Sequence, residues 1–465
     1  MEKNEEENDK IEQNNDDKEK NKDDPYISRK KLIYVCFAFI GLVNNLGYVL
    51  IITSAQQFAS KLNNDTLIAF YPLALIVFNS SARVINSKCC ITISYFKRIL
   101  FLSIYFCIGY LFLFAILLII DNSDDFDEDL AFFLTLIPAV IMGTGQSFGE
   151  ATFLGYIRTF PEDYVSGWSS GTGLAGVFGA SLSLIFKLIQ ESFDLKNLYL
   201  IISPVTVLFF LAFYITYRIK NRIDNELIKS TWEESEDKKK ENDEVYEGEE
   251  RDSKNESLEI KGRLSQCSEL LNGNQSRASD VSLNKNLSCG NFTIAFKYGK
   301  RYILNLFLVY FLEYTICSGF AERSNYFEYV DSSDTFIEDA QYETFLLCYQ
   351  IGVLISRSSL FIFKYLMYVE VLNFIQIVNF TFWLFEALEG IVTNQWVCFV
   401  TLFFLGLCGG GVYVGCFYFV LNDKKIPPEY KELCLNISTI FIDIGVLLSS
   451  IVCVVLDNTI MNNED

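Results

Sequence analysis

Three carboxylic acids stand inside long apolar segments of the sequence, and they are the side chains with the clearest chemical potential. Glu150 follows Gly-Gln-Ser-Phe-Gly, Glu313 stands in Val-Tyr-Phe-Leu-Glu-Tyr-Thr-Ile, and Asp443 lies in the last apolar segment. An ionisable side chain in hydrocarbon costs about 3 kcal/mol on insertion scales, so each requires a function or a partner. Such a carboxyl can pass a proton between two compartments, and it can equally hydrogen-bond a neighbouring helix or pair with an arginine. We expect Glu150 and Glu313 to face a central cavity.

Uncharged polar residues accompany these acids. Asn44, Asn45 and Tyr48 stand in the first apolar segment, and Gln146 precedes Glu150 by about one helical turn. Adjacent asparagines lie on helix faces about 100° apart, so at least one amide faces protein or a cavity rather than lipid. Locking of two helices and contact with a substrate explain these amides equally well. We include all four residues, with the three acids, as candidates for a substrate or proton pathway.

A further set of side chains could form a gate or contact an anion. Ser169, Ser170 and Thr172 open an apolar segment in the run Trp-Ser-Ser-Gly-Thr-Gly, where hydroxyls and a helix start offer hydrogen-bond donors. Small residues also permit close helix packing, and a position near the membrane surface favours a gate or packing seam over a deep site. Arg357 could hold a phosphate or carboxylate through its planar guanidinium. Near the end of a segment, however, it more readily reaches the headgroups or makes a gating pair between helices.

The elements that position these residues are predicted to be membrane-spanning helices. The chain is 51% hydrophobic although 21% of it is charged, so the two kinds of residue must be segregated. Apolar blocks of about 20 residues are the length that a helix needs to cross about 30 Å of hydrocarbon. We therefore expect an all-α integral membrane protein with about eleven transmembrane helices, at roughly 32–54, 67–86, 98–120, 130–157, 168–189, 197–217, 302–321, 343–363, 366–386, 395–420 and 433–456.

The polar segments predict which side of the membrane the chain starts on and where the chain divides into bundles. Alternate connections are rich in Lys and Arg, which places the N-terminus in the cytoplasm. The sequence then reads as a disordered cytoplasmic tail, a six-helix bundle, a disordered cytoplasmic loop, a five-helix bundle and a short tail, at 1–31, 32–217, 218–300, 301–457 and 458–465. The loop is a candidate site for cytoplasmic protein partners. Asn64-Asp65-Thr66 is a glycosylation sequon in an expected lumenal loop.

Several classes of function are excluded by what the sequence lacks. Histidine is absent, which removes the commonest metal ligand, and the thirteen cysteines mostly stand in apolar stretches as small buried hydrophobes. No phosphate-binding loop, catalytic constellation or basic stripe is present. We expect no metal, no cofactor, no nucleic-acid partner and no enzymatic activity; the partners are the lipid bilayer and a small solute, moved with or without H⁺.

The sequence resembles the battenin family of lysosomal and vacuolar membrane proteins over roughly 35–217 and 302–457. The likeness rests on the motifs GLVNNLGYVLIITSA, GQSFGEATFL, SGWSSGTGLAGVFGA, VYFLEYTICSGF, YQIGVLISRSSLF and GLCGGGVYVGCFY. The resemblance implies a major-facilitator-like fold in lysosomes, late endosomes or vacuoles, and a role in lysosomal pH and solute balance. It also implies that Glu313 and Arg357 stand where family members carry an important glutamate and arginine.

Two functions remain open at this level. The leading one is a secondary carrier that works by alternating access between the halves. The resemblance to battenins implies a basic amino acid or a glycerophosphodiester as its solute. Paired carboxylates suit a basic amino acid, whereas a phosphodiester needs a cation in the cavity and the sequence shows few deep ones. The alternative is a non-transporting scaffold that regulates endolysosomal trafficking or the proton pump through the loop at 218–300.

Overall fold

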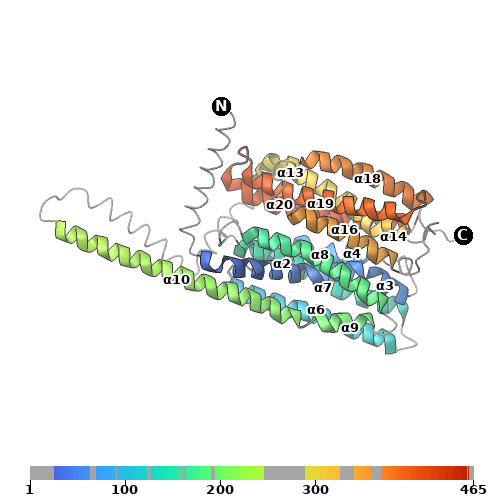
Figure 1. The fold of residues 1–465 in the computed structure, drawn as a ribbon, viewed down its shortest axis with the longest axis horizontal. Helices are drawn as coiled ribbons and strands as arrows, with labels where there is room; N and C mark the ends of the chain where they lie inside the picture. Colours follow the sequence, from blue (N-terminus) through green and yellow to red (C-terminus); the bar gives the residue numbers. More distant parts are fainter. Residues whose placement is uncertain are drawn as a thin grey trace.

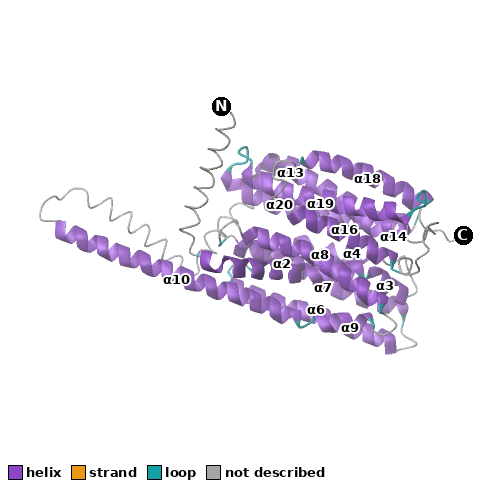
Figure 2. Cartoon of the chain, viewed as in Figure 1, coloured by secondary structure: helices purple, strands orange, loops and turns teal. Residues whose placement is uncertain are grey.

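The computed structural model is all-helical over the residues that it describes (Figure 2). These are 26–62, 70–90, 92–122, 127–157, 159–160, 164–189, 194–245, 289–324, 340–358, 368–457 and 459. The first half contains α2 (Lys30–Thr53), α3 (Ala55–Lys61), α4 (Phe70–Ile76), α5 (Asn79–Lys88), α6 (Tyr95–Asn122), α7 (Glu128–Ile157), α8 (Tyr164–Leu188), α9 (Leu195–Ile202) and α10 (Val205–Val245). The second half contains α13 (Cys289–Thr315), the π-helix η3 (Ile316–Phe320), α14 (Ala321–Arg323), α16 (Gln341–Ser358), α18 (Val369–Glu389), α19 (Gln395–Asn422) and α20 (Pro428–Asp457).

Nine helices within the described residues are long and apolar enough to cross a membrane, and each of the eleven expected segments is mainly helical where it is described. The second segment falls outside the nine because a turn at Val77 and Phe78 divides it into α4 and α5. The break comes where the apolar run gives way to Asn-Ser-Ser, residues that favour helix starts over helix interiors. The eighth segment, α16, is only 18 residues long and carries both Glu343 and Arg357. The all-α membrane fold is therefore confirmed.

Helices occupy both ends of the segment 218–300, which the sequence predicts to be a disordered loop. Helix α10 continues past the expected boundary at 217 to Val245, and α13 already begins at Cys289. Figure 1 shows the end of α10 extending well beyond the other helices. Lys and Glu are good helix formers, and Lys220 pairs with Asp224 one turn later at 2.9 Å, so a charge-rich composition supports an exposed helix as well as a loop. Residues 246–288, the tail at 1–25 and the sequon at Asn64 lie outside the described residues.

Packing sorts the helices into two bundles that lie side by side (Figure 1). One apolar core joins α2 to α10 and contains residues from Ile33 to Ile223. The second half has its own cores, in which α13 packs on α20 and α16 packs on α19. The bundles meet mainly where α8 lies against α16 and where α4 and α5 lie against α20. Polar side chains at these contacts between helices therefore face the other bundle rather than lipid.

The start of α8 combines a packing seam with a polar surface, and glycine makes this possible. A Cβ atom at Gly171 would lie 1.9 Å from the backbone oxygen of Ala38 on α2, whereas a Cβ atom at Gly173 would meet nothing closer than 3.4 Å. We expect Gly171→Ala to lower stability by about 1–3 kcal/mol, because the α2 backbone must move away. Gly173→Ala is the matched control and should leave the thermal unfolding midpoint in detergent almost unchanged. Equal midpoints for the two variants would contradict this packing.

Candidate functional site

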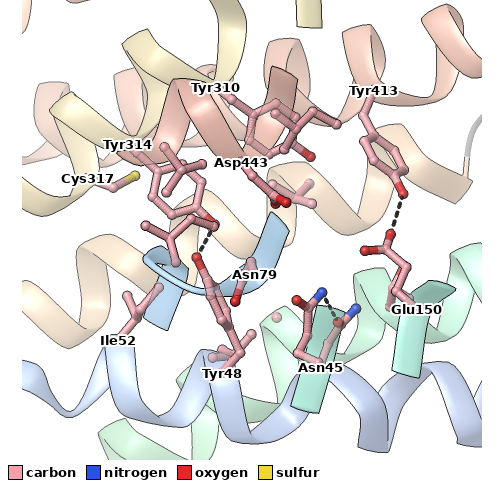
Figure 3. A pocket seen from close by; sticks show the side chains of 18 of the residues that line it. Asn45, Tyr48, Ile52, Asn79, Glu150, Tyr310, Tyr314, Cys317, Tyr413 and Asp443 are labelled. Atoms are coloured by element: carbon pink, nitrogen blue, oxygen red, sulfur yellow. Dashed lines mark hydrogen bonds between the residues drawn. The ribbon is translucent and has the colours of Figure 1, made fainter. Parts of the chain in front are cut away.

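A polar pocket of about 140 Å³ lies between the two bundles (Figure 3). Its walls come from α2, α4, α5, α7 and α8 on one side and from α13, η3, α16, α19 and α20 on the other. Ligand pockets typically measure roughly 300–1,000 Å³, so this pocket is smaller than most and has room for little more than a small polar group. A larger solute would need the bundles to move apart.

Arg83 on α5 holds two of the predicted acids in this pocket. Its Nη2 donates to Glu150 Oε2 at 2.8 Å, and its Nε donates to Asp443 Oδ2 at 3.0 Å. Ser80 Oγ also donates to Asp443 at 3.3 Å, and Tyr413 OH donates to Glu150 Oε1 at 3.5 Å. Glu150 and Asp443 both line the pocket, and they form an ion-pair network with Arg83 that ties the first bundle to α19 and α20.

Arg83 is the residue that sequence reasoning did not assign. It stands close to the expected end of its segment, where an arginine normally reaches the headgroups. The turn at Val77 and Phe78 redirects the helix, and Arg83 is buried between the bundles instead. The polar run Asn79-Ser80-Ser81 just before it was the available signal, because polar residues inside an apolar segment indicate a face turned toward protein.

Arg357 on α16 also lines the pocket, and among the described residues it forms no salt bridge, although Glu313 interacts with it electrostatically. Its Nη1 donates to Thr172 Oγ1 at 3.4 Å and its Nη2 donates to Tyr310 OH at 3.3 Å. The guanidinium lies 4.4 Å from the centre of the Tyr413 ring, and its buried Nε finds no hydrogen-bond partner. Arg357 thus contacts α8 of the other bundle, which fits the pair between helices that the sequence suggested rather than a reach toward the headgroups; its role in gating stays a prediction. The side chain offers a partly buried positive charge to the pocket.

Glu313 does not face the pocket, contrary to expectation. Its side chain is 3% exposed, it accepts a hydrogen bond from Tyr349 OH, and its Oε2 has no partner in the described part of the chain. Tyr310 and Tyr314 on α13 and Cys317 on η3 face the pocket at helical spacing, whereas position 313 turns toward Gly409 on α19. Glu313 therefore lies behind Tyr349, which does line the pocket.

The sequence left two uses open for the amide residues, locking of two helices and contact with a substrate. The structure places some of these residues in the pocket and one between helices. Asn45, Tyr48 and Gln146 line the pocket, and Gln146 Nε2 donates to Asn45 Oδ1 at 2.9 Å. Tyr48 OH donates to Tyr314 OH at 3.1 Å across the bundle interface, as Figure 3 shows. Asn44 instead is fully buried outside the pocket, where its Nδ2 donates to the backbone oxygen of Gln146 at 3.1 Å. Asn44 locks α2 to α7.

The three hydroxyl residues at the start of α8 do not all face the pocket. Thr172 lines the pocket, but Ser169 and Ser170 do not. Ser170 Oγ lies 3.4 Å from Tyr34 OH on α2, and the backbone oxygen of Ser169 accepts from Thr172 Oγ1 at 2.8 Å. Ser170 belongs to the seam between α8 and α2, whereas the hydrogen bond that Ser169 accepts stays within α8. Within the described residues, no group of three or more His, Cys, Asp or Glu side chains is arranged to hold a metal ion.

The fold is similar to that of transporters of the major facilitator superfamily. The proton:xylose symporter XylE, bound to 6-bromo-6-deoxy-D-glucose, superposes with a TM-score of 0.59 at 14% identity over 92% of this chain and 88% of its own. A bacterial homologue of the human lysosomal transporter Spinster, in an inward-facing and unoccupied conformation, superposes with a TM-score of 0.52 at 12% identity over 90% and 80%. These likenesses establish a major-facilitator-like fold, as the sequence predicted.

Relatives of known name match over most of the chain. Battenin of Dictyostelium discoideum is 27% identical over 436 residues, which is 93% of this chain and 95% of the relative. Protein BTN1 of Candida glabrata is 27% identical over 94% of this chain and 97% of its own, and dog battenin is 26% identical over 69% and 64%. The family model described as CLN3 protein matches residues 35–463. The chain therefore belongs to the CLN3, or battenin, family, and it is a multi-pass membrane protein with a transporter fold.

Proposed function

We propose that the protein is a carrier that moves a small solute with an anionic group across a lysosomal, late endosomal or vacuolar membrane by alternating access. The observation that carries this proposal is Arg357, a guanidinium that lines the inter-bundle pocket and forms no salt bridge among the described residues. A planar guanidinium binds a phosphate or carboxylate through paired hydrogen bonds. The family and the major-facilitator-like fold support the assignment to transport.

Within the two solute classes that the sequence suggests, the pocket favours a glycerophosphodiester. The expected shortage of deep cations is wrong, since Arg83 and Arg357 both line the pocket. A basic amino acid would need free carboxylates, but Glu150 and Asp443 are already paired with Arg83. Tyr310, Tyr314 and Tyr413 add aromatic faces that suit a quaternary ammonium group such as choline.

The pocket is bridged at both ends, as a carrier in a closed state requires. Arg83 joins Asp443 toward the end where α2 begins, and Gln57 on α3 donates to Glu343 on α16 at 3.0 Å toward the end where α2 finishes. Breaking one bridge while keeping the other would expose the pocket to one side at a time. The N-terminus of α2 is expected to face the cytoplasm, which would put the Gln57 and Glu343 contact on the lumenal side.

Uptake by purified protein in liposomes tests this function. We expect saturable uptake of radiolabelled glycerophosphocholine above that of protein-free liposomes, and weaker uptake of radiolabelled arginine. A variant lacking 246–288 should retain this uptake, because the residues that carry the proposal belong to the helices of the two bundles. Stronger uptake of arginine would overturn the choice of solute. Absence of uptake for both solutes would favour the scaffold, whose activity should instead depend on that segment.

A further inference from the structure

A separate polar contact joins the bundles outside the pocket. It lies at the end of the molecule that carries α3, away from the extension of α10 (Figure 1). Gln57 Nε2 donates to Glu343 Oε1 at 3.0 Å, and both side chains are buried. Neither residue lines the pocket, but Leu346, one turn after Glu343, does. The contact thus closes the interface next to the pocket.

The amide of this contact is held in place by the first bundle. Gln57 Nε2 also donates to Ser183 Oγ on α8 at 3.2 Å. Ser183 Oγ in turn donates to the backbone oxygen of Thr53 at 2.9 Å and lies 3.1 Å from Ser54 Oγ. These bonds connect the end of α2, α3 and α8. The first bundle therefore presents a fixed donor to a single group on α16, the Glu343 carboxyl.

The Glu343 side chain has fewer hydrogen-bond partners than the Gln57 side chain. The residue is 0% exposed, and its Oε2 has no hydrogen-bond partner in the described part of the chain. The charged side chains on the elements packed around it are Lys187 on α8, Lys61 on α3, and Glu322 and Arg323 on α14. None of them forms a salt bridge with Glu343, and Lys61 pairs instead with Asp121 at 2.6 Å. The carboxyl is buried with one side-chain donor, Gln57, and within the described residues Lys187 interacts with it electrostatically without forming a salt bridge.

This environment suits a neutral carboxylic acid much better than a carboxylate. An ionised group that leaves water without a salt-bridge partner loses its hydration and gains little in return, whereas the neutral acid has less to lose. Separation of α3 and α8 from α16 would admit water and let the group ionise. Closure of this end would then be accompanied by binding of a proton.

We propose that Glu343 is a proton-binding site that makes closure of this end of the carrier dependent on pH. The proposal rests on the carrier function proposed above. The proton comes from water at the open end, binds to the Glu343 carboxylate and leaves again when that end reopens. Closure is therefore favoured at low pH and opposed as the pH rises above the range in which an exposed glutamate titrates. The acids in the pocket differ from Glu343, since Glu150 and Asp443 are paired with Arg83.

Exchange of glycerophosphocholine across liposomes with equal pH on both sides tests this site. With the wild-type protein we expect the exchange rate to fall at least about fivefold from about pH 5 to about pH 7.5, because closure of the Glu343 end becomes rate-limiting. Glu343→Gln keeps the acceptor for Gln57 but cannot titrate. It should exchange at the wild-type acid rate throughout this range, which also shows that the variant folds and binds the solute.

Asp194→Asn is the matched control, because Asp194 is a carboxylate whose side chain is 48% exposed and paired with Lys196 outside the inter-bundle contact. It should follow the wild-type pH profile. A Glu343→Gln profile that falls like the wild type, or a wild-type profile that is flat, would overturn the inference while leaving the carrier intact. Absence of exchange by the wild-type protein at every pH would overturn the proposed function and this inference with it.

Discussion

Arg357→Gln is expected to lower kcat/KM for glycerophosphocholine uptake by at least about 100-fold. Charge-assisted hydrogen bonds from a partly buried guanidinium to an anionic group are worth about 3 kcal/mol or more, and each 1.4 kcal/mol corresponds to a factor of ten. Glutamine keeps some hydrogen-bonding capacity but removes the charge and the stacking on Tyr413. Initial rates of uptake into liposomes, measured over a range of solute concentrations, give the ratio.

Two further variants separate anion binding from general damage. Arg357→Lys keeps the charge but loses the planar fork, so its kcat/KM should lie between those of the wild type and Arg357→Gln. Arg301→Gln removes an arginine from the same bundle whose side chain is 63% exposed and paired with Glu370, and it should leave uptake unchanged. If Arg301→Gln reduced uptake as strongly as Arg357→Gln, the assignment of an anion site to Arg357 would fail.

Arg83→Met is expected to destabilise the protein by about 3–5 kcal/mol, because it leaves Glu150 and Asp443 buried together without a cation. The thermal unfolding midpoint in detergent should therefore fall strongly. Neutralising both acids in the same chain, by Glu150→Gln and Asp443→Asn, should recover most of the loss, since the cost comes from unpaired charges rather than from the missing arginine itself.

Arg301→Met is the control for this pair, because an exposed ion pair contributes only about 0–1 kcal/mol. Its unfolding midpoint should stay close to that of the wild type. A triple variant no more stable than Arg83→Met would contradict the view that Arg83 neutralises the two acids. Comparable losses in the Arg83→Met and Arg301→Met variants would contradict the burial of the network.

The helices were predictable from the sequence because membrane burial requires long apolar runs. The structure departs from that prediction at two places, and each has its own physical cause. The turn at Val77 and Phe78 follows from tertiary packing of short helices, and the extension of α10 to Val245 reflects a composition that suits either a polar loop or an exposed helix. Composition alone does not separate these two states.

Charged residues in hydrocarbon were equally visible in the sequence, but the direction in which each side chain points was not. One position along a helix changes the facing direction by about 100°. This explains why Asn45 lines the pocket while Asn44 does not, and why Tyr310 and Tyr314 face it while Glu313 is turned away. The partnership of Arg83 with Asp443 joins residues 360 positions apart, which no local pattern reveals.

The central claim is that the two bundles open the pocket alternately at its two ends. Distances between spin labels at two pairs of residues outside the pocket test it most directly. Lys97 and Lys424 report on one end, and Lys61 and Glu389 report on the other. Labels attached through a non-natural amino acid leave the native cysteines unmodified. Addition of glycerophosphocholine to the reconstituted protein should lengthen one distance while shortening the other. If both distances stayed unchanged, or if both changed in the same direction, alternating access would be contradicted.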